Sequence, residues 1–128
     1  MELSETNAAA SGEIAQTSTP VLDLRHLNHQ TLGDAELRRV VLQLFLSEIS
    51  KYVSDVANAR DRAAWRMAVH TLKGVALNLG AFQLAQICRQ HENAEPAVTQ
   101  LRKQEALTAL AQSVAATRSA IQAVVGQC

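Results

Sequence analysis

The segment Ala68-Val69-His70-Thr71-Leu72-Lys73-Gly74-Val75-Ala76-Leu77-Asn78-Leu79-Gly80-Ala81 has the clearest helical pattern in this sequence. Its apolar residues recur at steps of three and four, which is typical of an amphipathic helix. At about 100° per residue, His70 lies about 120–180° away from the apolar stripe. The stripe contains Trp65, Ala68, Leu72, Val75, Ala76 and Leu79. His70 is therefore predicted on the outer face, where a core histidine would not be placed.

Three residues flank His70 on this outer face. Arg66 lies about one turn before it, Lys73 about one turn after it, and Gly74 at about +40° around the helix. A neutral imidazole is a nucleophile, and a lysine ammonium can lie beside phosphoryl oxygens as a point charge. Glycine inside a helix costs about 0.5–1 kcal/mol relative to alanine, and steric access would explain that cost. The pattern predicts that His70 accepts a phosphoryl group.

The following helix is expected to bring a carboxylate to His70. The two helices form a hairpin that turns at about Gly80–Ala81, and reflecting position 70 through position 81 gives Glu92. Glu92 is therefore predicted at the height of His70. If it accepts a hydrogen bond from Nδ1–H, the ring is oriented and Nε2 is left as the nucleophile.

The rest of the chain predicts further helices and no strand. Asp23, Asp34 and Asp61 are plausible N-caps of helices that end before Gly33, near residue 58 and near residue 78. Two more helices are expected, one at about 81–93 and one that runs to about 125, and Pro96 either stops the first or begins the second. The predicted fold is all-α, an antiparallel four-helix bundle with a short extra N-terminal helix. Residues 1–19 are expected to be a disordered tail, and residues 20–128 one domain.

The second helix, from Asp34 onward, has many apolar positions at three- and four-residue steps. We expect them to form one stripe that faces the core. The stripe contains Leu37, Val40, Val41, Leu44, Phe45, Ile49, Tyr52, Val53 and Val56.

Composition argues against several function classes. Lys+Arg and Asp+Glu number 12 each, so no overall field favours nucleic acid or an anionic membrane. Aromatic residues make up 3% of the chain, too few for a base-stacking platform. No apolar run approaches about 18 residues, and Cys88 and Cys128 show no metal-ligand spacing. We expect a cytoplasmic monomer without a nucleic-acid or membrane partner.

An apolar rim is predicted near His70. Ala63, Met67 and Leu77 surround it on the exposed side, with Arg66 adding a charge. Such a rim is suited to docking a partner helix.

Several segments of this sequence resemble the histidine-containing phosphotransfer (HPt) domain. The resemblance rests on His70-Thr71-Leu72-Lys73-Gly74, on Asn78-Leu79-Gly80-Ala81, and on Leu84, Cys88 and Glu92. It implies that His70 is phosphorylated, that Lys73 steadies the phosphate and that Gly74 gives access. Glu92 matches a position where an acidic or amide side chain bonds the histidine. The expected partners are receiver domains of a hybrid sensor kinase and of response regulators.

The resemblance also implies a multistep phosphorelay in which a receiver supplies the chemistry that this chain lacks. We expect no cofactor in this chain and Mg²⁺ on the partner's receiver domain. No Gly-rich phosphate loop and no second catalytic acid is apparent, so no autonomous kinase or hydrolase activity is expected.

Two alternatives stay open at this stage. The chain could be a non-catalytic module that binds and sequesters a response regulator, although simple docking needs neither Lys73 nor Gly74. A metal-binding bundle could use His70, His91 and Glu92, but positions 91 and 92 lie about 100° apart on a helix, so convergence is not expected. His91 departs from the family pattern. It could be a second hydrogen-bond partner or a tolerated boundary residue. No metal site is expected.

Overall fold

The computed structural model describes residues 19–92 and 100–126. These residues form five helices and contain no strand, which confirms the all-α class. The helices are α2 (Leu24–Gln30), α3 (Ala35–Asn58), α4 (Arg62–Leu79), α5 (Phe82–His91) and α6 (Gln100–Gly126). The predicted tail up to residue 18, the end of the fourth predicted helix at 93, and Pro96 lie outside the described residues.

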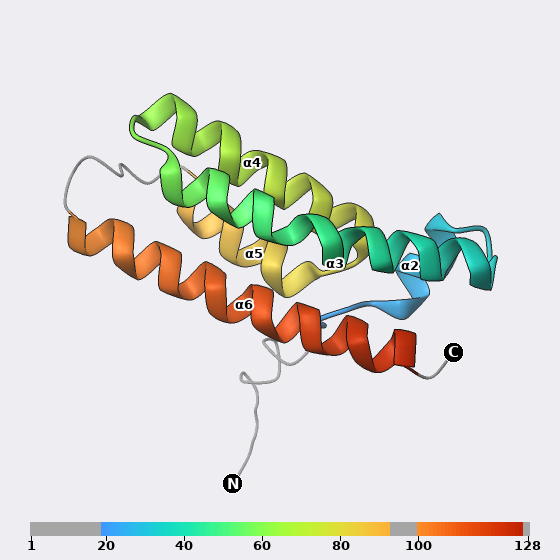
Figure 1. Cartoon of the computed structure of the whole chain (residues 1–128). Helices are drawn as coiled ribbons and strands as arrows, with labels where there is room; N and C mark the ends of the chain where they lie inside the picture. Colours follow the sequence, from blue (N-terminus) through green and yellow to red (C-terminus); the bar gives the residue numbers. More distant parts are fainter. Residues whose placement is uncertain (1–18, 93–99, 127–128) are drawn as a thin grey trace, which may run out of the picture.

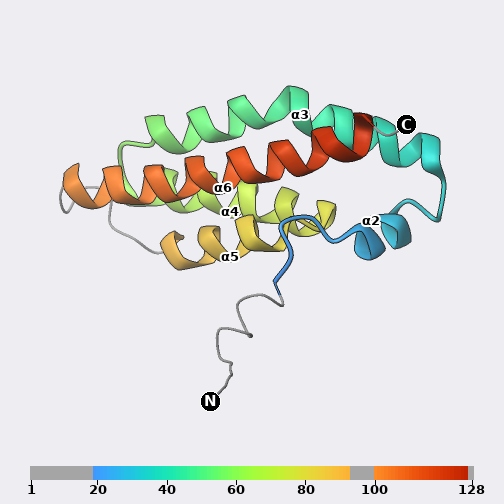
Figure 2. The same cartoon turned by 90° about the horizontal axis from the view of Figure 1, so that it is seen from below.

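Helices α3 to α6 run alongside one another and alternate in direction (Figures 1 and 2). Helix α4 packs against α3 and α5, and α6 packs against the same two helices, so the four form a closed ring. This is an antiparallel four-helix bundle. The short α2 packs against α3 and α4 at one end of the bundle, as expected.

Aspartate side chains begin three of the helices, as predicted. The Asp23 carboxylate accepts the backbone N–H of His26, and Asp34 accepts those of residues 36 and 37. Asp61 accepts the N–H of Ala64 at the start of α4. Each bond satisfies a backbone donor that has no partner within its own helix.

Gly80 ends α4 and also forms a backbone hydrogen bond with the start of α2. Its φ of 93° is left-handed, the conformation in which a glycine commonly ends a helix. The Asp23 N–H donates to the Gly80 carbonyl at 2.8 Å, which ties the start of α2 to the α4–α5 turn. A Cβ on Gly80 would lie 2.8 Å from the Asp23 carbonyl oxygen, so this position requires glycine for both reasons.

The predicted apolar stripe on α3 is partly wrong. Leu37, Val40 and Leu44 are 42%, 49% and 59% exposed, whereas Leu42, which was not in the stripe, is 1% exposed. On the helix, Leu42 lies about 20° from the fully buried Ile49, and the three exposed residues lie about 120–180° from it. The predicted stripe, built from steps of three and four residues, had therefore combined residues from two different faces of the helix. We call Leu37, Val40 and Leu44 the outer row.

None of the described helices is both long enough and apolar enough to span a lipid bilayer.

Candidate functional site

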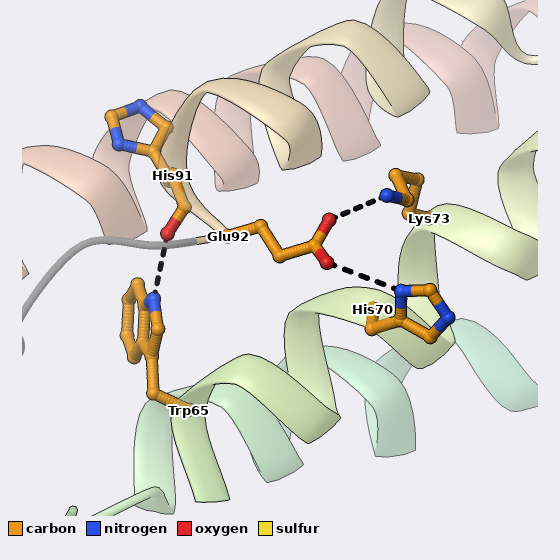
Figure 3. A network of polar contacts seen from close by, with 5 residues as sticks. All are labelled: Trp65, His70, Lys73, His91 and Glu92. Atoms are coloured by element: carbon orange, nitrogen blue, oxygen red, sulfur yellow. Dashed lines mark hydrogen bonds and ion pairs between the residues drawn. The ribbon is translucent and has the colours of Figure 1, made fainter. Parts of the chain in front are cut away.

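His70 lies on the outer face of α4, with its side chain 66% exposed. Its helix neighbours Val69 and Leu72 face inward and are fully buried. The Nδ1 atom of His70 lies 3.2 Å from Oε2 of Glu92 (Figure 3). Because a carboxylate can only accept, Nδ1 carries the proton in this contact. The predicted His70–Glu92 hydrogen bond is thus present, and Nε2 is the ring nitrogen left for chemistry.

Glu92 follows the last residue of α5 and bonds two side chains of α4. Its Oε1 accepts a hydrogen bond from Nζ of Lys73 at 2.5 Å, while Oε2 faces His70 (Figure 3). The hydrogen bond from Lys73 is the main cause that lowers the pKa of Glu92 below its ordinary value. Partial burial opposes this change, and the hydrogen bond from His70 adds to it. The carboxylate is therefore ionised at neutral pH.

The ammonium of Lys73 is held inside this network. Its side chain is 18% exposed, the same as that of Glu92, and it forms an ion pair with that carboxylate. The sequence predicted Lys73 one turn from His70, ready for phosphoryl oxygens. In the structure, Lys73 and His70 both contact the carboxylate of Glu92, and the sequence did not predict this shared contact.

Trp65 holds the end of α5 against α4. The fully buried indole donates from Nε1 to the carbonyl oxygen of His91 at 2.7 Å (Figure 3). His91 directly precedes Glu92, so this bond anchors the backbone from which Glu92 reaches His70. The sequence identified Trp65 only as a core residue. A buried indole N–H needs an acceptor, and that rule was the available signal.

The imidazole of His91 points away from His70 (Figure 3). The contact that His91 makes in this network is through its backbone carbonyl. His91 is therefore not a second side-chain partner of His70 in this structure.

A shallow hollow of about 400 Å³ lies beside His70. It is lined by Ala63, Arg66, Met67, His70 and Glu92. Three of the four predicted docking residues thus line the same hollow as His70, and Met67 is 69% exposed. Leu77, the fourth, is 36% exposed but does not line the hollow.

The family model of the Hpt domain matches residues 40–126, a range that contains the whole network around His70. The chain belongs to the Hpt domain family. Neither the comparison with curated proteins nor that with solved structures gave a match. Hpt domains are helical bundles that act in phosphotransfer and interact with receiver domains of phosphorelay proteins, so this chain has a role in phosphorelay signal transduction.

Open space surrounds Gly74 of this Hpt domain. A Cβ built there would meet no atom within 4 Å, so its own chain does not require a glycine at this position. The backbone does not require one either, because the positive-φ glycines of the described residues are Gly33 and Gly80. Neither the surroundings of Gly74 nor its backbone conformation therefore accounts for the glycine.

A second hollow in the Hpt domain, also about 400 Å³, lies between α3 and α4. It is lined by Val41, Leu44, Phe45, Glu48, Tyr52, Val75, Asn78 and Leu79. Leu44 also belongs to the outer row, so this groove continues onto the exposed apolar face of α3. The sequence did not predict the groove, because the apolar α3 residues that line it, Val41, Leu44, Phe45 and Tyr52, had been assigned to the stripe facing the core.

The metal-binding alternative finds no support in the described part of the Hpt domain. No group of three or more His, Cys, Asp or Glu residues in residues 19–92 and 100–126 is placed to hold a metal ion. His70 and Glu92 are in contact, but His91 faces elsewhere (Figure 3).

Proposed function

We propose that this Hpt domain carries a phosphoryl group on Nε2 of His70. The group comes from the aspartyl phosphate of one receiver domain and goes to the aspartate of another, the two receivers belonging to a hybrid sensor kinase and a response regulator. One observation supports this most: His70 is exposed, while Glu92 accepts a hydrogen bond from its Nδ1–H. The ring is thereby oriented, with its second nitrogen available as the nucleophile.

In the proposed reaction, the lone pair of Nε2 attacks the phosphorus atom. The bond from phosphorus to the aspartate oxygen breaks, and the aspartate leaves as a carboxylate. The reverse step, with a second aspartate as nucleophile, returns the electron pair of the N–P bond to Nε2. Lys73 would stabilise the phosphoryl oxygens, and Gly74 would leave room for them. Mg²⁺ on the receiver would supply further charge stabilisation, and this chain would need no cofactor of its own.

The docking face would include the rim around His70 and part of α3. The rim consists of Ala63, Arg66, Met67 and Leu77, and the outer row adds exposed apolar area beside the α3–α4 groove. Exposed apolar residues gathered in this way mark interaction sites. If so, Met67→Gln and Leu44→Gln will weaken receiver binding in isothermal titration calorimetry. A Kd unchanged in both variants would contradict this face.

The test of the function is a transfer assay. A receiver bearing labelled aspartyl phosphate is mixed with this chain and Mg²⁺, and the label is followed. We expect acid-labile, alkali-stable label on the wild type and none on His70→Gln, with the same helical circular dichroism in both. Equal labelling of the two would refute the assignment of His70. Tight binding without label from any receiver would favour a module that sequesters a response regulator.

We also propose a monomeric, cytoplasmic carrier with no autonomous kinase or hydrolase activity. A formal net charge of zero supports the absence of nucleic-acid and membrane partners. Analytical ultracentrifugation tests the monomer, and incubation with labelled ATP alone tests the absence of kinase activity.

A further inference from the structure

The carboxylate of Glu92 serves two donors at once. Oε2 faces Nδ1 of His70 at 3.2 Å, and Oε1 accepts from Nζ of Lys73 at 2.5 Å. Glu92 and Lys73 are each 18% exposed, and His70 is 66% exposed. In the unphosphorylated chain, the nearby ammonium therefore compensates part of the negative charge that Glu92 could offer to the imidazole.

Phosphorylation would change this balance. A phosphoryl group on Nε2 brings roughly −1.5 to −2 charges to a site one helical turn from Lys73. The ammonium gains more from two or three phosphoryl oxygens than from one carboxylate oxygen. Glu92 would then face the ring without a compensating cation.

We propose that phosphorylation draws Lys73 from Glu92 to the phosphoryl oxygens, and that the freed carboxylate keeps the proton on Nδ1, making the phosphohistidine a strong donor. This inference rests on the proposed function of His70. Glu92 acts through the imidazole and is a positioning residue.

The proton balance of the cycle explains the effect on donor strength. The attacking ring is neutral with a proton on Nδ1, so after Nε2 bonds to phosphorus the ring carries a positive charge. If the proton stays, breaking the N–P bond returns the electron pair to Nε2 and releases a neutral imidazole. If the proton is lost to water, the same step must expel an imidazolate, which is a much poorer leaving group. Keeping the proton therefore keeps the group transferable.

The charged groups around the ring are few. Helix α4 contributes Lys73 and also Arg66, which lines the hollow beside His70. The end of α5 contributes Glu92, and the ring of His91 faces away (Figure 3). Glu92 is the only carboxylate in contact with His70 among the described residues.

The experiment uses the full chain, phosphorylated with phosphoramidate and labelled with ¹⁵N in the imidazole. The ¹⁵N shifts of Nδ1 and Nε2 at neutral pH report the ratio of protonated to neutral phosphohistidine. Glu92→Gln keeps an acceptor oxygen but removes the charge, and should lower this ratio about tenfold, as one pKa unit would. Transfer from the phosphorylated chain to a receiver should slow by a similar factor. Glu105→Gln, an exposed carboxylate on α6, is the matched control.

A second variant tests the exchange of partners by Lys73. If the ammonium lies on the phosphoryl oxygens of the phosphorylated chain, Lys73→Met will shift the ³¹P resonance of the phosphohistidine and its titration. A ³¹P spectrum identical to that of the wild type would show that Lys73 stays on Glu92, and would overturn the exchange.

The outcomes separate this inference from the proposed function. If His70 takes and passes on the label but Glu92→Gln has the same ¹⁵N shifts as the wild type, the inference is wrong and the phosphotransfer role stands. If His70 takes no label from any receiver, the proposed function fails, and the inference fails with it.

Discussion

Replacing Gly74 with alanine should make the protein more stable and a poorer phosphoryl carrier. Gly74 lies inside α4, and a new Cβ would meet no atom within 4 Å. Alanine should therefore stabilise the folded state by about 0.5–1 kcal/mol without any clash. For a domain of this size, that gain raises the melting temperature by about 2–8 °C, which circular dichroism measures directly.

The expected loss of function has a different origin. The added methyl group would lie about 40° around the helix from His70, on the side from which we propose that a phosphoryl group and a receiver approach. We expect transfer from a phosphorylated receiver to slow by about tenfold, which corresponds to about 1.4 kcal/mol in the barrier. Gly74→Gln, with a longer side chain, should slow transfer further. Rapid-quench measurement of labelled His70 gives both rates.

Ser54→Ala provides the matched control. Ser54 is an exposed residue inside α3, so alanine there also favours the helix, but it introduces nothing near His70. Its transfer rate should equal that of the wild type. If Gly74→Ala transfers as fast as Ser54→Ala, the glycine does not serve steric access to His70. If Gly74→Ala is not stabilised, the open surroundings of Gly74 have been misjudged.

Three other contacts also lead to measurable predictions. Gly80→Ala should lower the free energy of unfolding by about 1–3 kcal/mol. The alanine would be forced into a left-handed conformation, with its methyl group 2.8 Å from the Asp23 carbonyl oxygen. An unchanged melting temperature would contradict this prediction. Trp65→Phe leaves the carbonyl of His91 without its donor, so it should lower the free energy of unfolding in urea by about 1–3 kcal/mol. Phosphoryl transfer should also be slower, because Glu92 loses its anchor. Wild-type values of both quantities would show that the bond is dispensable. The folded-state pKa of Glu92 is lowered, so its contribution to stability should be fully present above its ordinary pKa of 4.5 and lost as pH falls through the folded value. Urea unfolding should show the stability difference between wild type and Glu92→Gln shrinking below that pH, and a constant difference would count against the ion pair.

Local features of the chain were predictable because their causes lie within a few residues. Asp23, Asp34 and Asp61 accept backbone N–H groups two or three positions ahead, so each helix start depends on short-range chemistry. The left-handed Gly80 ends α4 for a similarly local reason. The contact between His70 and Glu92 was also predictable, because an antiparallel hairpin with a short turn pairs residues by reflection.

The burial pattern of α3 could not be predicted in the same way. Helical spacing shows that residues share a face, but not which face meets another helix. Leu42 is buried and Leu44 exposed because α3 packs against α4 and α6 on one side only. The apolar groove beside α4 depends on the same packing, so no single helix pattern contains it.

By itself, the sequence determined five helices, the N-caps of three of them, the outward position of His70 and the carboxylate beside it. Only the tertiary structure decided how that carboxylate is shared. The Lys73–Glu92 ion pair and the Trp65 bond to His91 join α4 to the end of α5, across 19 and 26 positions of the chain. Such bonds depend on side-chain directions and on a few ångströms of helix placement. Those quantities are set by the packing of the whole bundle, which no local pattern encodes.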